Sequence, residues 1–267
     1  MAEPALLTTV DRYGVARLTL NRPAVRNAFD EEMIAGVCDT IGRFNTDPNV
    51  RVIVMTGAGS AFCAGADLNM MQRVAAYSAD ENKDDARRLG HMLHSINNAA
   101  KPVVALVNGA ALGGGVGLIA ACDIAIASEE AFFALSEVKL GLMPAVIGPF
   151  VVAAMGAREA RRWLLTGERF DAETARRLGL VHMVAMPAQL NATLDGVLDN
   201  LLAGGPQAQQ EIKTLINAVA FKEINKSILE ETAGRIANIR SSAEGQEGMA
   251  AFLEKRVANW VVKRDEG

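Results

Sequence analysis

The sequence predicts an α/β core followed by a C-terminal helical part. Two stretches carry the prediction of the core, because each places a buried strand, a glycine-rich turn and a helix in succession: Arg51 to Met71 and Pro102 to Cys122. From Pro149 onward the pattern changes to amphipathic helical segments with one brief strand. The 267 residues suffice for one large domain with an appendage.

The N-terminal elements follow from short local patterns. Leu6 to Leu20 predicts two strands around a glycine turn. Asp30 can cap a helix whose apolar positions face inward, and Asp47-Pro48 ends that helix. The stretch from Ala75 to Asn82 is polar and is predicted to be a loop, whereas Asp84 to Asn98 has helical periodicity.

The second half of the chain is predicted to be mostly helical. Val181 to Val184 predicts a brief strand, and four longer helices follow at Leu190 to Leu202, Pro206 to Val219, Ile224 to Ile236 and Glu244 to Val257. Residues 1–200 are therefore assigned to the α/β core and residues 201–267 to a C-terminal helical oligomerisation and lid region. Helical appendages of this kind commonly cap a neighbouring subunit, so a homo-oligomer is expected.

The stretch from Asn108 to Pro144 contains the strongest functional pattern. Gly113-Gly114-Gly115 connects a strand to a helix, which leaves backbone N–H groups open at the positive end of the helix dipole. Such a turn binds a phosphate or an oxyanion. Gly57 to Asp67 is a turn of the same kind, so the two turns can each supply one N–H group to the same oxygen. The alternative is that the glycines only allow a helix to pack tightly on a strand.

The glycine-rich stretches do not fit three common motifs. The P-loop requires a Lys and a Ser or Thr after its last glycine, and Gly113 to Leu118 also lacks the dinucleotide-binding spacing. No G-x-S-x-G sequence is present, which argues against a nucleophile elbow. His91 and His94 have no third residue at a suitable spacing for zinc, so no metal site is expected.

Composition indicates a soluble, cytoplasmic enzyme. The net charge of −4 argues against nucleic-acid or membrane partners. Three widely separated cysteines fit neither a disulfide framework nor a zinc ribbon, which favours a reducing compartment. The N-terminus lacks the basic region of a signal peptide, and no stretch reaches the ~18 apolar residues of a membrane span.

Several motifs in combination resemble the enoyl-CoA hydratase/isomerase (crotonase) family. They are Ser60-Ala61-Phe62-Cys63-Ala64-Gly65-Ala66-Asp67-Leu68, Asn108-Gly109, Leu112-Gly113-Gly114-Gly115, Cys122-Asp123-Ile124 and Pro144. Leu165-Thr166-Gly167 and Phe252-Leu253-Glu254-Lys255-Arg256 extend the likeness over nearly the whole chain. The resemblance implies a crotonase-like spiral of ββα units whose C-terminal helices form a homotrimer, often paired into a hexamer.

The resemblance also implies a site. In this family an acyl-CoA thioester oxygen sits between two backbone N–H groups and gains enolate character, and by position these donors are Ala64 and Gly114. The residues implied to contact the CoA ester are Arg26, Ala64, Gly65, Ala66, Asp67, Leu68, Gly114, Pro144 and Lys255. Lys255 is expected to reach the CoA of its own or a neighbouring subunit. Coenzyme A is part of the substrate, so no separate cofactor is implied.

The acid–base residues depart from the family pattern. Hydratases of the family typically carry two glutamates, but here the first position is Gly117 and only the second, Glu137, is a carboxylate. Hydration requires activation of water and delivery of a proton to the α-carbon, which two carboxylates divide conveniently. With one carboxylate, Glu137 performs both steps in turn, or water or the substrate assists.

Three functions remain open on this basis. The sequence around the glycines looks most similar to bacterial 3-methylglutaconyl-CoA hydratases of leucine catabolism, and isohexenylglutaconyl-CoA hydratases are close to it. Because both substrates carry a free carboxylate, we hypothesise that this group organises water in the space left at Gly117. A lone glutamate also resembles the Δ3,Δ2-enoyl-CoA isomerases, which need no water. A non-catalytic acyl-CoA-binding scaffold is the third alternative. Candidates for the acyl pocket are Asn69, Met70, Val138 and Leu142.

Overall fold

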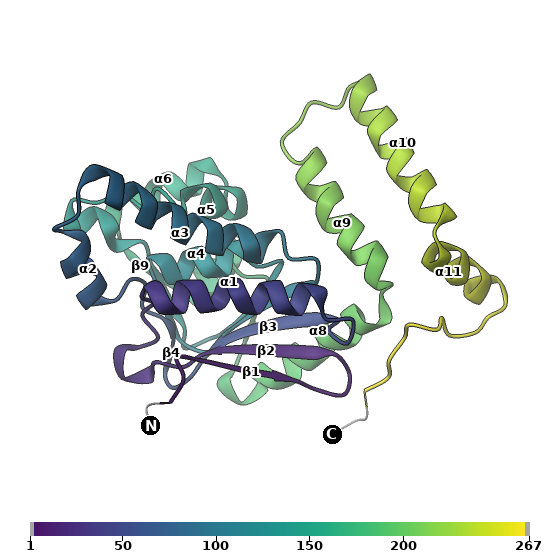
Figure 1. The fold of residues 1–267 in the computed structure, drawn as a ribbon, viewed down its shortest axis with the longest axis horizontal. Helices are drawn as coiled ribbons and strands as arrows, with labels where there is room; N and C mark the ends of the chain where they lie inside the picture. Colours follow the sequence, from purple (N-terminus) through teal and green to yellow (C-terminus); the bar gives the residue numbers. More distant parts are fainter. Residues whose placement is uncertain (1–2, 265–267) are drawn as a thin grey trace.

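The computed structural model describes residues 3–264, in which a large and a small β-sheet are covered by helices (Figure 1). The large sheet has the strand order β1-β2-β3-β5-β7-β10, and only β1 and β2 pair antiparallel. Its strands are β1 Leu6–Val10, β2 Val15–Leu20, β3 Val52–Gly57, β5 Val103–Val107, β7 Ile124–Ser128 and β10 Met183–Ala185.

The small sheet completes the spiral of ββα units. Its strands, in the order β4-β6-β8-β9, are β4 Ala61–Cys63, β6 Ala110–Leu112, β8 Phe132–Ala134 and β9 Arg169–Asp171. The strands β4, β6 and β8 each follow a strand of the large sheet, namely β3, β5 and β7. This repetition confirms the predicted α/β spiral of ββα units. The sequence analysis missed the four short strands because three residues are too few to show an alternating pattern.

The first four helices connect these strands. They are α1 Glu31–Thr46, α2 Leu68–Val74, α3 Ala79–Asn97 and α4 Gly114–Ala121. Asp30 caps α1 as predicted, because its side chain accepts a hydrogen bond from the Met33 N–H. The prediction of a loop from Ala75 to Asn82 was wrong at its end. Ser78 and Glu81 form a reciprocal capping box there, and α3 begins at Ala79.

The second half of the chain is mostly helical, as predicted. They are α5 Gly148–Met155, α6 Ala157–Thr166, α7 Ala172–Arg177, α8 Leu190–Ala203, α9 Pro206–Val219, α10 Lys226–Ser241 and α11 Ala243–Leu253. The described residues also form three short 3₁₀ helices, which are η1 Pro23–Val25, η2 Ser136–Leu140 and η3 Pro187–Gln189. Among residues 3–264, no helix has both the length and the apolar composition needed to cross a membrane.

The large sheet is buried on both faces. On β3, Ile53 and Met55 belong to the core cluster that includes α1, α3 and α4, whereas Val52 and Val54 pack with residues of α8. Successive residues of a strand point to opposite faces, so both faces of β3 must be apolar. This explains why Arg51 to Thr56 reads as a continuous apolar run.

Helices α9, α10 and α11 form an arm that extends away from the two sheets (Figure 1). The boundary predicted after residue 200 falls inside α8, and Gly204 and Gly205 separate α8 from the arm. At the base of the arm, the Nζ atom of Lys213 lies 2.6 Å from Oδ2 of Asp123. Arg51 also ties the returning C-terminal segment to the core, because its Nη1 donates to the Trp260 carbonyl at 2.8 Å.

Candidate functional site

The two glycine-rich turns predicted to act together lie against each other. The strands that precede them, β4 and β6, pair in parallel, so their C-terminal ends meet at one edge of the small sheet. A Cβ atom on Gly65 would lie 3.4 Å from the backbone nitrogen of Gly114. Gly65 and Gly113 have φ angles of +88° and +50°, which favour glycine at both turns.

Phe29 connects the two turns. Its N–H donates to the Gly65 carbonyl at 2.8 Å, and its own carbonyl accepts a hydrogen bond from the Asp67 N–H at 2.9 Å. The ring of Phe29 lies against Gly114, where a Cβ atom would be 2.7 Å from Cε1 and would overlap Cζ. Phe29 therefore pairs with one turn through its backbone and contacts the other through its side chain.

Ala64 does not offer the open donor that the sequence analysis assigned to it. Its N–H donates to the Arg26 carbonyl at 2.9 Å. Among residues 3–264, the N–H of the exposed Ala66 has no acceptor, and neither does that of Gly114, the first residue of α4. Ala66 on the first turn and Gly114 at the start of the second therefore each offer an open N–H group. The sequence alone did not distinguish Ala64 from Ala66, because the choice depends on how Arg26 to Phe29 pairs with this turn.

Glu137 lies beside the second turn. It belongs to η2, and its Oε1 atom would be 3.0 Å from a Cβ atom on Gly113. Its Oε2 atom is buried and has no hydrogen-bond partner among the described residues. Burial raises the pKa of this carboxyl group, and a hydrogen bond from its own backbone opposes that shift only in part. A carboxyl group that keeps its proton to higher pH and has a free oxygen is suited to proton transfer.

The space expected at Gly117 is filled. A Cβ atom on Gly117 would lie 2.8 Å from Cβ of Ile147 and would overlap its Cγ2 atom. Ile147 is 3% exposed and directly precedes α5, which packs on α4. The hypothesis that water occupies a space left at Gly117 is therefore wrong. Ile147 is thirty residues from Gly117, and nothing in the local sequence indicates their contact.

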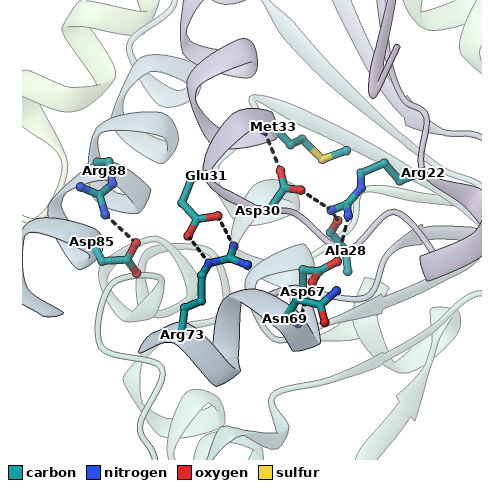
Figure 2. A network of polar contacts seen from close by, with 10 residues as sticks. All are labelled: Arg22, Ala28, Asp30, Glu31, Met33, Asp67, Asn69, Arg73, Asp85 and Arg88. Carbon is teal, nitrogen blue, oxygen red and sulfur yellow. Dashed lines mark hydrogen bonds and ion pairs between the residues drawn. The ribbon is translucent and has the colours of Figure 1, made fainter. Parts of the chain in front are cut away.

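The side chain of Asp67 is turned into the protein, which corrects its prediction as a residue that contacts the CoA ester through its carboxylate. Its carboxylate is bound by Arg22 at 2.9 Å and caps α2 by accepting from the Asn69 N–H, and Arg22 also contacts Asp30 and the Ala28 carbonyl (Figure 2). Asp67 is only 3% exposed. Burial favours a higher pKa for Asp67, but these hydrogen bonds and the charge of Arg22 outweigh it and lower the pKa.

Arg22 is a residue that the sequence analysis did not single out. Its guanidinium group connects Asp67 and Asp30, the residues that cap α2 and α1, and so joins the first glycine-rich turn to the start of α1 (Figure 2). In the sequence it appears only in Asn-Arg-Pro after β2. An arginine next to a proline is an ordinary loop residue, so no local signal predicts this role.

The other residues that were predicted to contact the CoA ester lie in separate parts of the molecule. Arg26 is exposed in a left-handed conformation next to Ala64, Leu68 is 76% exposed at the start of α2, and Pro144 is half-buried beyond η2. Lys255 follows α11, which Figure 1 shows at the opposite end of the molecule from α2. The structure does not bring Lys255 of the same chain to these turns.

The arrangement can stabilise a developing negative charge and move a proton next to it. Two open N–H groups on facing turns can hold an oxygen that gains charge, and the carboxyl group of Glu137 lies next to one of these turns. Within the described residues, no three His, Cys, Asp or Glu side chains are grouped so that they could hold a metal ion.

Comparisons with known proteins agree on one family. The model of the family described as enoyl-CoA hydratase/isomerase matches residues 11–263. The chain is 33% identical over 251 residues to the crotonyl-CoA hydratase of Syntrophomonas wolfei, and the match covers 93% of this chain and 95% of that protein.

Solved structures match over the same extent. A crystal structure of an enoyl-CoA hydratase from Shewanella pealeana is 42% identical with a TM-score of 0.93, and the match covers 96% of each chain. Pseudomonas aeruginosa AtuE is 38% identical with a TM-score of 0.92, over 97% of this chain and 100% of that one.

Proposed function

Because this chain belongs to the enoyl-CoA hydratase/isomerase family, we propose that it hydrates a 2-enoyl-CoA ester reversibly, with Glu137 as its single acid–base carboxylate. The proposed substrate is 3-methylglutaconyl-CoA or a related ester. The observation that carries the proposal is the position of Glu137. Its carboxyl group contacts the turn at Gly113, and its Oε2 atom is buried without a hydrogen-bond partner in residues 3–264. A buried carboxyl oxygen without a partner is costly, which favours a functional role.

The thioester carbonyl oxygen would accept hydrogen bonds from the N–H groups of Ala66 and Gly114. Negative charge grows on this oxygen as the α-carbon gains enolate character, so donors already aimed at it lower the barrier. The loss of one such donor typically costs about 3–4 kcal/mol of transition-state stabilisation. Gly114 also contributes the positive end of the α4 dipole, which adds to this effect.

Glu137 would handle the proton in two steps. Its carboxylate takes a proton from water as the water oxygen bonds to the β-carbon, and the thioester becomes an enolate. The carboxyl group then gives that proton to the α-carbon, which restores the thioester and the carboxylate. The pKa of Glu137, raised by burial, favours the first step because a more basic carboxylate takes the proton from water more readily.

A panel of enoyl-CoA esters in water enriched in ¹⁸O tests this proposal. We expect one ¹⁸O atom in the product and a higher kcat/KM for 3-methylglutaconyl-CoA than for crotonyl-CoA. Equal kcat/KM values for the two esters would contradict 3-methylglutaconyl-CoA as the preferred substrate. Absence of turnover across the whole panel would contradict the enzyme function and leave an acyl-CoA-binding scaffold as the alternative.

Isomerisation of a 3-enoyl-CoA to a 2-enoyl-CoA is the second candidate. The observation that favours it is the contact of Ile147 with Gly117, because a hydrocarbon side chain there can neither hold nor activate water. One carboxylate suffices to move a proton from one carbon to another. In the same experiment, migration of the double bond without ¹⁸O incorporation identifies this reaction.

We also propose that the arm mediates self-association into a trimer or a hexamer. It exposes a series of large apolar side chains, which are Ile212, Ile216, Phe221, Ile224, Leu229, Ile236, Met249, Phe252 and Leu253. An apolar surface of this extent favours a protein partner. In such an assembly, Lys255 would act at the site of a neighbouring subunit.

Sedimentation equilibrium measures the self-association directly. A trimer or a hexamer has three or six times the subunit mass of 28.3 kDa. We expect Phe252→Asp, which places a charge in the apolar surface of the arm, to lower the measured mass. A monomer at micromolar concentration would contradict the proposal.

A further inference from the structure

Ile147 occupies the place into which a side chain at position 117 would extend. The overlap involves both Cβ and Cγ2 of Ile147, so a small shift of one terminal methyl group would not relieve it. Gly117 and Ile147 are both buried, and α4 and α5 pack directly on each other. Side chains at these two positions therefore compete for the same volume.

This contact lies one helical turn from the position that meets Glu137. Gly113 directly precedes α4, and its carbonyl accepts a hydrogen bond from the Gly117 N–H at 3.3 Å, so the two positions are one turn apart, about 6 Å along the helix axis. Glu137 contacts the first position and Ile147 the second. A carboxylate carried by residue 117 could approach the carboxyl group of Glu137, whereas the side chain of Ile147 offers no group that binds a proton.

We propose that Ile147 is a specificity-determining residue of this site. By filling the place beside Gly117, it excludes a second acid–base side chain and the water that such a side chain would hold. Proton transfer then depends on Glu137 alone. This inference rests on the proposed enoyl-CoA function, but it holds for hydration and for isomerisation alike.

The inference predicts that positions 117 and 147 must change together. Gly117→Glu by itself forces a carboxylate into the side chain of Ile147, and we expect the melting temperature to fall by at least about 5 °C. Ile147→Gly by itself leaves a cavity and also lowers the melting temperature. In the double variant, the new side chain fills the space that Ile147 vacated, so we expect it to melt above Gly117→Glu.

The activity test uses the same proteins with crotonyl-CoA in ¹⁸O-enriched water. We expect the double variant to hydrate this ester at least about tenfold faster than Ile147→Gly, because a second carboxylate then shares the proton transfers. The pH dependence of the hydration rate of the double variant should show a second ionisation. Gly117→Gln combined with Ile147→Gly is the matched control, because it adds a side chain of the same size that cannot exchange a proton, and it should show neither gain.

Controls separate this inference from the proposed function. Gly42→Glu in α1 places the same side chain where, in the described part of the chain, no atom beyond the adjacent backbone of its own helix lies within 4 Å of the new Cβ, and it should leave the melting temperature nearly unchanged. If Gly117→Glu does not fold, Gly117→Ala with and without Ile147→Ala provides the same steric comparison.

The possible outcomes are distinct. A wild-type melting temperature for Gly117→Glu, or a folded double variant with neither faster hydration nor a second ionisation, would overturn the inference. A wild-type protein that is inactive on every ester would overturn only the proposed function, because hydration gained by the double variant would still support the role of Ile147.

Discussion

The ring of Phe29 lies against Gly114, while the backbone of Phe29 pairs with Gly65 and Asp67. One residue thus sets how far the turn that contains Ala66 stands from the N-terminus of α4. Both open N–H groups belong to these two turns. Their spacing therefore depends on a buried aromatic side chain that takes no part in proton transfer.

Gly114→Ala should be destabilising and should lower activity. The new methyl group would overlap the Phe29 ring, and overpacking of this kind costs about 1–3 kcal/mol of unfolding free energy. Because the same clash displaces the Gly114 N–H, kcat/KM should fall as well. Urea unfolding and steady-state kinetics measure the two effects.

Two further variants test the cause of the Gly114→Ala effect. Phe29→Leu provides space, so it should recover part of the stability when combined with Gly114→Ala. Gly42→Ala is the control, because the new methyl group in α1 meets no described atom within 4 Å beyond the adjacent backbone of its own helix. It should be neutral or stabilising by up to about 1 kcal/mol. Strictly additive effects of Gly114→Ala and Phe29→Leu would contradict the proposed contact.

Glu137→Gln should abolish turnover while CoA-ester binding stays largely intact. The amide keeps the size of the side chain but cannot exchange a proton, and acid–base groups usually contribute about 10²–10⁴-fold to the rate. Stopped-flow assays and calorimetry with a product ester separate rate from affinity. The matched control is Glu130→Gln, an exposed position beyond β7. A Glu137→Gln enzyme that retained more than about a tenth of the wild-type rate would remove this carboxylate from the mechanism.

The same substitution should change how stability depends on pH. Burial raises the pKa of Glu137 in the folded protein above that of the unfolded chain, which is about 4.3. As the pH rises through the interval between these two values, the unfolded chain releases its proton first, and the wild type loses stability. Glutamine has no such transition.

The unfolding free energy of wild type is subtracted from that of Glu137→Gln. This difference should be more positive at pH values near 7 than at pH values near 4, which is about the ordinary pKa of a glutamate. Urea titrations of both proteins at the two pH values measure it. The comparison with wild type cancels the contributions of other groups, such as Asp67. A difference that does not vary with pH would show that ionisation of Glu137 is not opposed by burial.

Arg22→Met should destabilise the protein more than the removal of an exposed arginine. The variant leaves the buried carboxylate of Asp67 without its partner, and the loss of one member of a buried ion pair costs about 3 kcal/mol or more. Arg87→Met is the control, because the Arg87–Asp84 pair is largely exposed and should contribute less than about 1 kcal/mol.

The loss of unfolding free energy caused by Arg22→Met should depend on pH in the opposite direction to the contribution of Glu137. Arg22 helps to hold the pKa of Asp67 below its ordinary value, so its stabilising effect is present near neutral pH and is lost as the pH falls through the folded pKa. We also expect Asp67→Asn to recover part of the loss in the Arg22→Met background. Equal destabilisation by Arg22→Met and Arg87→Met would contradict this account.

The sequence by itself determined the parts of the fold that depend on neighbouring residues. The apolar run of β3, the Asp30 cap of α1 and the glycine turns after β4 and β6 all follow from local patterns, and the combined motifs indicated the family. The capping box of Ser78 and Glu81 was also readable in the sequence, although the polar composition around it favoured a loop.

Only the tertiary structure decided which groups are open at the site. The N–H of Ala64 is occupied by Arg26, Asp67 is bound by Arg22, and the space beside Gly117 is filled by Ile147. In each case the two residues are far apart in the sequence. Their contact results from the pairing of distant backbone segments and from the packing of helices. A local pattern reports which conformation a segment prefers, but it does not report which distant groups satisfy its hydrogen bonds or fill its volume.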